Sequence, residues 1–160
     1  MVVMHLTSKT KAPMYGEPHS DFEKEIDGKT YVLDDNPLGW KNFRFDFSKD
    51  GKEGTITYEN NRGVKTVKFG MGELKKDTFP ETHYYDKKRN EPSGRELDCL
   101  SVCEWVEEKK ILLRVYITDT SFGNMFMTFG FKGEEVGIYS HVRAEFFLED
   151  YRGMAGGRRK

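Results

Sequence analysis

The chain has 160 residues, of which 14% are aromatic and 33% are charged. Its 26 basic and 27 acidic side chains are interspersed and leave a formal charge of -1, so no long-range field would attract nucleic acid or an anionic membrane. The aromatic content excludes disorder for most of the chain. The length predicts one domain that buries its core without disulfides or metal ions.

Residues 1–27 show no strand periodicity and predict a linker or N-terminal arm ahead of the folded domain. The segment carries Pro13 and Pro18 among charged and polar residues, and one helical turn is expected near residues 21–26. Residues 1–6 are too short and too weakly apolar for a secretory signal. No segment reaches the roughly 18 apolar residues of a membrane span.

Residues 28–152 predict an all-β domain, because strand-length runs alternate with turn sequences and helical patterns are scarce. Residue pairs such as Asp50-Gly51 and Lys132-Gly133 favour tight hairpins between antiparallel neighbours. Eight consecutive hairpin strands can close into a barrel, which leaves no exposed sheet edge. The eight candidate strands span residues 29–34, 40–47, 54–59, 64–69, 95–105, 110–118, 123–132 and 135–142.

The clearest alternation lies in residues 110–131, where apolar side chains recur at every second position of two successive strands. The expected inward residues could line a cavity for an apolar ligand, or they could fill the barrel with their own side chains. Both alternatives stay open at this point. The candidate interior residues are Phe43, Phe45, Val115, Met127 and Phe129.

Two segments interrupt the strand pattern. Residues 70–94 are too long for an ordinary hairpin loop and predict a packed excursion, a lid or a contact surface. Its candidate contact residues are Phe79, His83, Tyr84 and Tyr85, aromatic anchors within a charged rim. Residues 144–152 predict a short amphipathic C-terminal helix ended by Gly153, and residues 153–160 a flexible tail.

Two short motifs match elements of serine hydrolases, but their context argues against catalysis. Ser8 and Lys11 form an S-x-x-K match inside the polar arm, and Tyr58 with Asn60 forms a Y-x-N match at a strand end. Asp119 lies beside hydroxyl residues in a turn, where an aspartate commonly bonds its own backbone. We therefore predict no catalytic residues in this chain.

The sequence predicts no metal site and no cofactor. Cys99 and Cys103 lie four apart on one strand, about 13 Å from each other at 3.3 Å per residue, too far for a disulfide or for one shared ion. Two unpaired thiols favour a reducing, cytoplasmic compartment. The histidines show no metal-ligand spacing; they are His5, His19, His83 and His141.

Several segments of residues 28–157 resemble the lipocalin-like C-terminal accessory domain of bacterial β-lactamase-like (penicillin-binding-protein-like) serine hydrolases. The matching segments are GKTYVLDDNPLGW at 28–40, FGMGEL at 69–74, W-x-E-E-x-x-I-L at 105–112, YITDTSFGN at 116–124 and AEFFLEDYRGMAGG at 144–157. The resemblance implies a lipocalin-like barrel. It also implies a larger catalytic domain upstream, and no catalytic residue of that domain has a counterpart here.

The resemblance yields a first hypothesis: a non-catalytic accessory domain that docks on the catalytic domain of its own parent chain and modulates access to it. The alternative hypothesis is a free-standing, lipocalin-like carrier of a small apolar ligand. An enzyme in its own right is the third. A coding sequence that continues upstream into a catalytic domain would favour the first hypothesis over the second.

Overall fold

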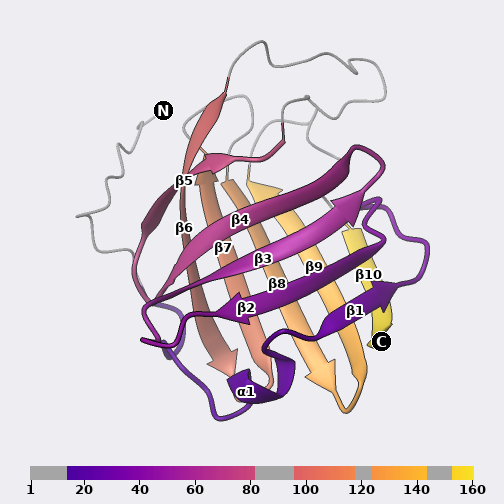
Figure 1. Cartoon of the computed structure of the whole chain (residues 1–160), viewed down its shortest axis with the longest axis horizontal. Coiled ribbons are helices and arrows are strands. Elements are labelled where there is room, and N and C mark those ends of the chain that lie inside the picture. Colours follow the sequence, from indigo (N-terminus) through magenta and orange to yellow (C-terminus); the bar gives the residue numbers. More distant parts are fainter. Residues whose placement is uncertain (1–13, 82–95, 118–123, 144–152) are drawn as a thin grey trace.

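A computed structural model of the chain describes residues 14–81, 96–117, 124–143 and 153–160, which form ten strands and one short helix (Figure 1). Among these residues, no helix is long and apolar enough to cross a membrane. The elements are α1 (Glu23–Ile26), β1 (Thr30–Leu33), β2 (Asn42–Phe47), β3 (Glu53–Asn60), β4 (Gly63–Met71), β5 (Lys75–Phe79), β6 (Leu97–Glu107), β7 (Lys110–Ile117), β8 (Asn124–Lys132), β9 (Glu135–Arg143) and β10 (Gly153–Arg159).

The strands form a closed barrel, so the prediction of an all-β antiparallel barrel is confirmed. Neighbouring strands pair in the order β4-β3-β2-β1-β10-β9-β8-β7-β6-β5, and a parallel contact between β4 and β6 closes the ring. The closed ring therefore has nine strands, while β5 lies outside it and pairs with β6. Figure 1 shows β1 to β4 crossing in front of β6 to β10, with α1 at one end.

The described residues form ten strands, whereas the sequence predicts eight. The two additional strands are β5, inside the predicted excursion of residues 70–94, and β10, inside the predicted tail of residues 153–160. The sequence of β10, GMAGGRR, has little strand propensity, but the strand pairs with β1 on one side and β9 on the other. Pairing on both edges outweighs weak local propensity. The predicted helix at 144–152 lies outside the described residues.

The alternation in β7 and β8 places its apolar side chains inside the barrel, as expected. Ile111 lies opposite Phe129, Leu113 opposite Met127, and Val115 opposite Met125, in an antiparallel register. All of these side chains are buried. Because side chains alternate between the two faces of a strand, this register brings both apolar sets onto one inner face.

The second half of the predicted arm packs against the barrel. Glu17 exchanges two backbone hydrogen bonds with Trp105 of β6, at 2.7 and 2.8 Å. Gly16 permits this approach, because a Cβ there would lie 2.2 Å from the Trp105 carbonyl oxygen. Helix α1 follows near the predicted helical turn and buries Ile26 completely. This segment therefore covers β6 beyond the point where β6 pairs with β4.

Candidate functional site

The five candidate interior residues lie together inside the barrel. Phe43, Phe45, Val115, Met127 and Phe129 are each at most 1% exposed and belong to one apolar cluster. The Phe129 ring lies 5.1 Å from that of Phe43 and 5.0 Å from that of Phe45, between ring centroids. Aromatic rings at these distances are in contact. Side chains therefore fill this section of the barrel.

Aromatic side chains also pack at the barrel end where α1 lies. Phe22, just before α1, contacts Trp105 at 6.3 Å and Phe131 at 5.7 Å between ring centroids. Tyr31 stacks on Phe43 at 5.2 Å and touches Phe131 at 5.3 Å. The α1 end of the interior is therefore bulky and aromatic.

The opposite barrel end is more polar. There Trp40 stacks on Tyr58 at 4.0 Å between centroids. The Tyr58 hydroxyl donates to Oε1 of Glu81 at 2.7 Å, and the Asn60 amide donates to the same oxygen at 2.9 Å. Glu81 is only 1% exposed. The two residues of the Y-x-N match thus hold a buried carboxyl group that no sequence motif indicates.

Smaller side chains line the interior on β6 and β9 near that polar end. Cys99 and Ser101 follow the start of β6, and Ser140 precedes the end of β9; all three are buried. Strand alternation gives Ser101 the same inward face as Cys99. Small side chains on β6 and β9 therefore lie at the same end of the described interior as the Trp40 and Tyr58 rings.

Both cysteines are free and buried, and neither is set up as a nucleophile. Burial raises the pKa of the Cys99 thiol to about 11, although Ser101 donates a weak hydrogen bond to its sulfur at 3.8 Å. Burial also raises the pKa of Cys103 well above its ordinary value. A thiol with a raised pKa carries little reactive thiolate near neutral pH. The described residues contain no group of three or more His, Cys, Asp or Glu side chains placed to hold a metal ion.

The raised pKa of Cys99 predicts a loss of stability at alkaline pH. The unfolded thiol releases its proton near 9.0, whereas the folded thiol keeps it to about 11. The stabilisation is therefore complete below the unfolded pKa and is lost as the pH rises toward the folded pKa, by at most about 1.4 kcal/mol per pH unit. Denaturant unfolding between pH 8 and 11 should give a shallower decline for Cys99→Ala than for the unmodified chain. Parallel declines would contradict the burial of a protonated thiol.

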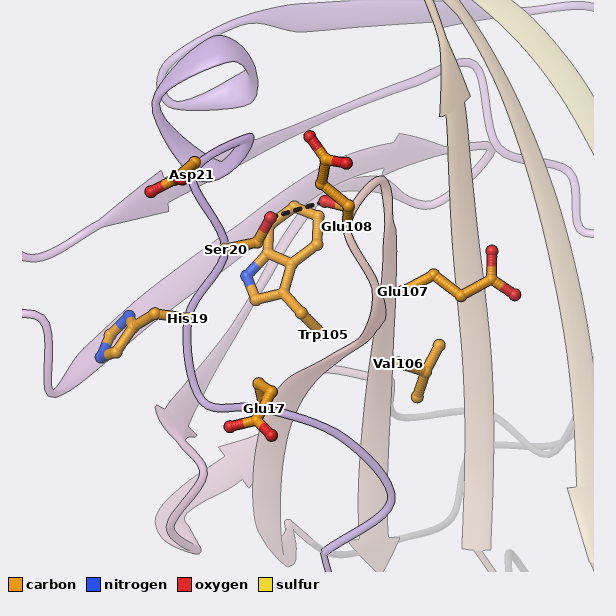
Figure 2. Close-up of a pocket in the computed structure, with 8 residues that line it drawn as sticks. All are labelled: Glu17, His19, Ser20, Asp21, Trp105, Val106, Glu107 and Glu108. Atoms are coloured by element: carbon orange, nitrogen blue, oxygen red, sulfur yellow. Dashed lines mark hydrogen bonds between the residues drawn. The ribbon is translucent and has the colours of Figure 1, made fainter.

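A surface groove of about 470 Å³ lies between the N-terminal segment and the β6–β7 hairpin (Figure 2). Ser20 Oγ donates to the Glu108 carbonyl at 2.6 Å, and His19 Nδ1 lies 3.5 Å from Glu23. Figure 2 shows the His19 ring pointing away from Ser20, so the two do not form a nucleophile and base pair. The groove is lined by Glu17, His19, Ser20, Asp21, Trp105, Val106, Glu107 and Glu108.

The predicted docking surface is not supported at Phe79, the one of its four residues that the structure describes. Phe79 is 2% exposed and belongs to the interior cluster, because it is the inward end of β5. An aromatic residue among charged neighbours suits a surface anchor or an edge strand equally well, and only the pairing of β5 with β6 decides. His83, Tyr84, Tyr85 and the S-x-x-K match lie outside the described residues.

Comparison with known proteins gives a likeness of fold. No protein-family model matches the sequence, and no curated protein does. A solved structure described as the REP1-NXSQ fatty acid transporter matches with a TM-score of 0.51 and 10% identity, over 86% of this chain and 97% of that one. The fluorescent protein UnaG matches at 0.48 and 17% identity, over 87% and 99%. A fatty-acid-binding protein isolated from Manduca sexta L matches at 0.49 and 15%, over 84% and 98%.

These findings correct the hypothesis of a hydrolase accessory domain. The fatty acid transporter that this barrel resembles is matched over 97% of its length, so the barrel there makes up nearly the whole chain. Within this chain every strand of the nine-stranded ring pairs on both sides, and the barrel closes without a second domain. The predicted resemblance to β-lactamase-like serine hydrolases, the docking role and the hydrolase partner are therefore wrong.

Proposed function

We propose that this chain is a non-catalytic β-barrel carrier that holds a small apolar ligand inside the barrel. The observation that carries the proposal is the closed ring, because its strands contribute inward apolar side chains to one continuous cluster. Antiparallel barrels of about this size hold one small ligand or fill with side chains. The likeness to a barrel described as a fatty acid transporter supports the first alternative.

The small interior side chains of β6 and β9 suggest where the ligand lies. The rings of Phe43, Phe45 and Phe129 touch one another and leave that section to the protein's own side chains. Cys99 and Ser101 are smaller and lie toward the opposite end. We therefore place the apolar part of the ligand beside β6 and β9, between the phenylalanine rings and Glu81. An apolar ligand there would replace water against an apolar wall, which is favourable in proportion to the area covered.

The test is a titration with Nile red, a neutral apolar dye, combined with native mass spectrometry of the purified chain. We expect saturable binding of one dye molecule. Ser101→Leu, which adds bulk inside the barrel, should weaken binding about tenfold or more. Thr128→Leu adds the same side chain on the outer face of β8 and should change the affinity less than about twofold.

Two results would contradict the proposal. Failure of the folded chain to bind Nile red, with no apolar molecule copurified, would exclude a carrier. Binding that Thr128→Leu and Ser101→Leu weaken equally would place the dye outside the barrel. Circular dichroism of both variants separates a lost site from a lost fold.

A further inference from the structure

Glu81 carries an unused hydrogen-bond acceptor in a buried position. Its Oε1 accepts from Tyr58 at 2.7 Å and from Asn60 at 2.9 Å. Its Oε2 is buried and has no hydrogen-bond partner. Native proteins seldom leave a buried acceptor unpaired, because it has lost its water without gaining a replacement. An unpaired carboxyl oxygen of this kind indicates a partner that arrives from outside the chain.

The position of Glu81 relates this oxygen to the barrel interior. The buried residues of β3 are every second one, and Tyr58 and Asn60 belong to that inward set. Glu81 bonds both of them, so its carboxyl group lies at the inner side of the wall. Tyr58 stacks on Trp40, and Trp40 in turn lies 6.5 Å from Phe129 between ring centroids. Aromatic contacts therefore run from the carboxyl group to the apolar cluster.

Among the described residues, no cation lies within 4.0 Å of the Glu81 carboxylate oxygens to form an ion pair. Lys65 lies opposite Tyr58 in the strand register, but its ammonium group is 3.5 Å from the Pro80 carbonyl. The fully buried Arg114 cannot bind a ligand carboxylate inside the barrel either, because it pairs with Glu104 on the outer face of β6 and β7. A ligand carboxylate facing Glu81 would be repelled, whereas a hydrogen-bond donor on the ligand would give Oε2 the partner that it lacks.

Resting on the proposed carrier function, we infer that Glu81 Oε2 accepts a hydrogen bond from the polar end of the ligand. The ligand is accordingly an apolar molecule that ends in a hydrogen-bond donor, a hydroxyl or an ammonium group, and the barrel disfavours one that ends in a carboxylate. This chemistry differs from the fatty acid named for the fold neighbour. A charge-assisted hydrogen bond to a carboxylate is stronger than a neutral one, so a ligand with an ammonium end should bind more tightly than one with a hydroxyl end.

The experiment compares three probes of equal chain length, dodecylammonium, dodecan-1-ol and dodecanoate, as competitors of Nile red on the full chain below their critical micelle concentrations. We expect dodecanoate to bind about tenfold or more weakly than dodecylammonium. Glu81→Gln keeps the shape and an oxygen for Tyr58 and Asn60, but it replaces the free acceptor by an amide donor. This variant should bind dodecylammonium more weakly and dodecanoate more tightly than the unmodified chain does, so the order of the two affinities reverses. Lys65→Met should leave the order unchanged.

The outcomes separate this inference from the carrier function. If dodecanoate binds the unmodified chain most tightly and Lys65→Met removes that preference, the head-group site belongs to Lys65 and the inference is overturned while the carrier stands. Equal affinities for all three probes, unchanged in Glu81→Gln, also overturn it. If neither Nile red nor any probe binds, the carrier function itself fails. Should Glu81→Gln not fold, the order of affinities in the unmodified chain still decides.

Discussion

Replacing Phe129 by alanine is expected to lower the free energy of unfolding by about 3 to 5 kcal/mol, since a buried ring would leave a cavity among rings that cannot collapse into it. Phe129 is 0% exposed and lies opposite Ile111. Its ring touches Phe43 and Phe45 at about 5 Å. Chemical denaturation followed by tryptophan fluorescence measures the change, because Trp40 lies close to the ring.

The neighbouring Thr128 provides a matched control on the same strand. Its side chain points to the outer face and is only partly buried, so Thr128→Ala should change the free energy of unfolding by less than about 0.5 kcal/mol. A denaturation midpoint for Phe129→Ala that equals the midpoint of the unmodified chain would show that the inner and outer faces of β8 are exchanged. A large effect at Thr128 would indicate the same.

The faces of β7 and β8 could be predicted from sequence because the period of two is a local property of an extended chain. Leu113 and Met127 each sit in a run of alternating apolar residues, and the register then places them opposite each other. The closed barrel followed from hairpin turns between such runs. Information of this kind needs no knowledge of distant residues.

Strands β5 and β10 could not be predicted in this way, because their pairing partners define them. Gly153–Arg159 contains three glycines and two arginines, and it becomes a strand between β1 and β9. Phe79 has the sequence surroundings of a surface anchor, yet β5 pairs with β6 and turns the ring inward. Composition alone does not distinguish an edge strand from a contact loop.

The candidate site at Glu81 could not be predicted from the sequence, for a related reason. Glu81 follows Pro80 in a segment rich in charges, where a carboxylate is ordinarily solvated. Its partners, Tyr58 and Asn60, precede it by 23 and 21 residues. No motif has that spacing. The Y-x-N match contains both partners, Tyr58 and Asn60, but it is interpreted from sequence as a chance match and gives no indication of the buried carboxyl group that they hold.

Glu104 and Arg114 are a second buried pair that alternation would place in solvent. Both face outward from the barrel, yet both are 0% exposed, and Arg114 Nη2 lies 2.7 Å from Glu104 Oε1. The N-terminal segment contributes to their burial: the Tyr15 amide donates to Glu104 Oε2 at 3.0 Å, and the Tyr15 ring lies 4.7 Å from the guanidinium carbon. This ion pair therefore anchors the segment that leads through Glu17 to α1 and the aromatic barrel end.

Replacing Arg114 by methionine is expected to lower the free energy of unfolding by about 3 to 5 kcal/mol, because Glu104 would keep a buried charge with the Tyr15 amide as its one remaining partner among the described residues. The double variant Glu104→Met, Arg114→Met removes both charges and should recover most of that loss. Denaturant unfolding of the two single variants and the double variant gives the coupling between the residues. In hydrogen exchange, Arg114→Met should also expose the amide of Glu17, which bonds to Trp105. If Arg114→Met and the double variant were equally destabilised, the loss of stability would come from packing and the unpaired charge of Glu104 would contribute nothing. If the Glu17 amide kept its protection in Arg114→Met, the ion pair would not anchor the N-terminal segment.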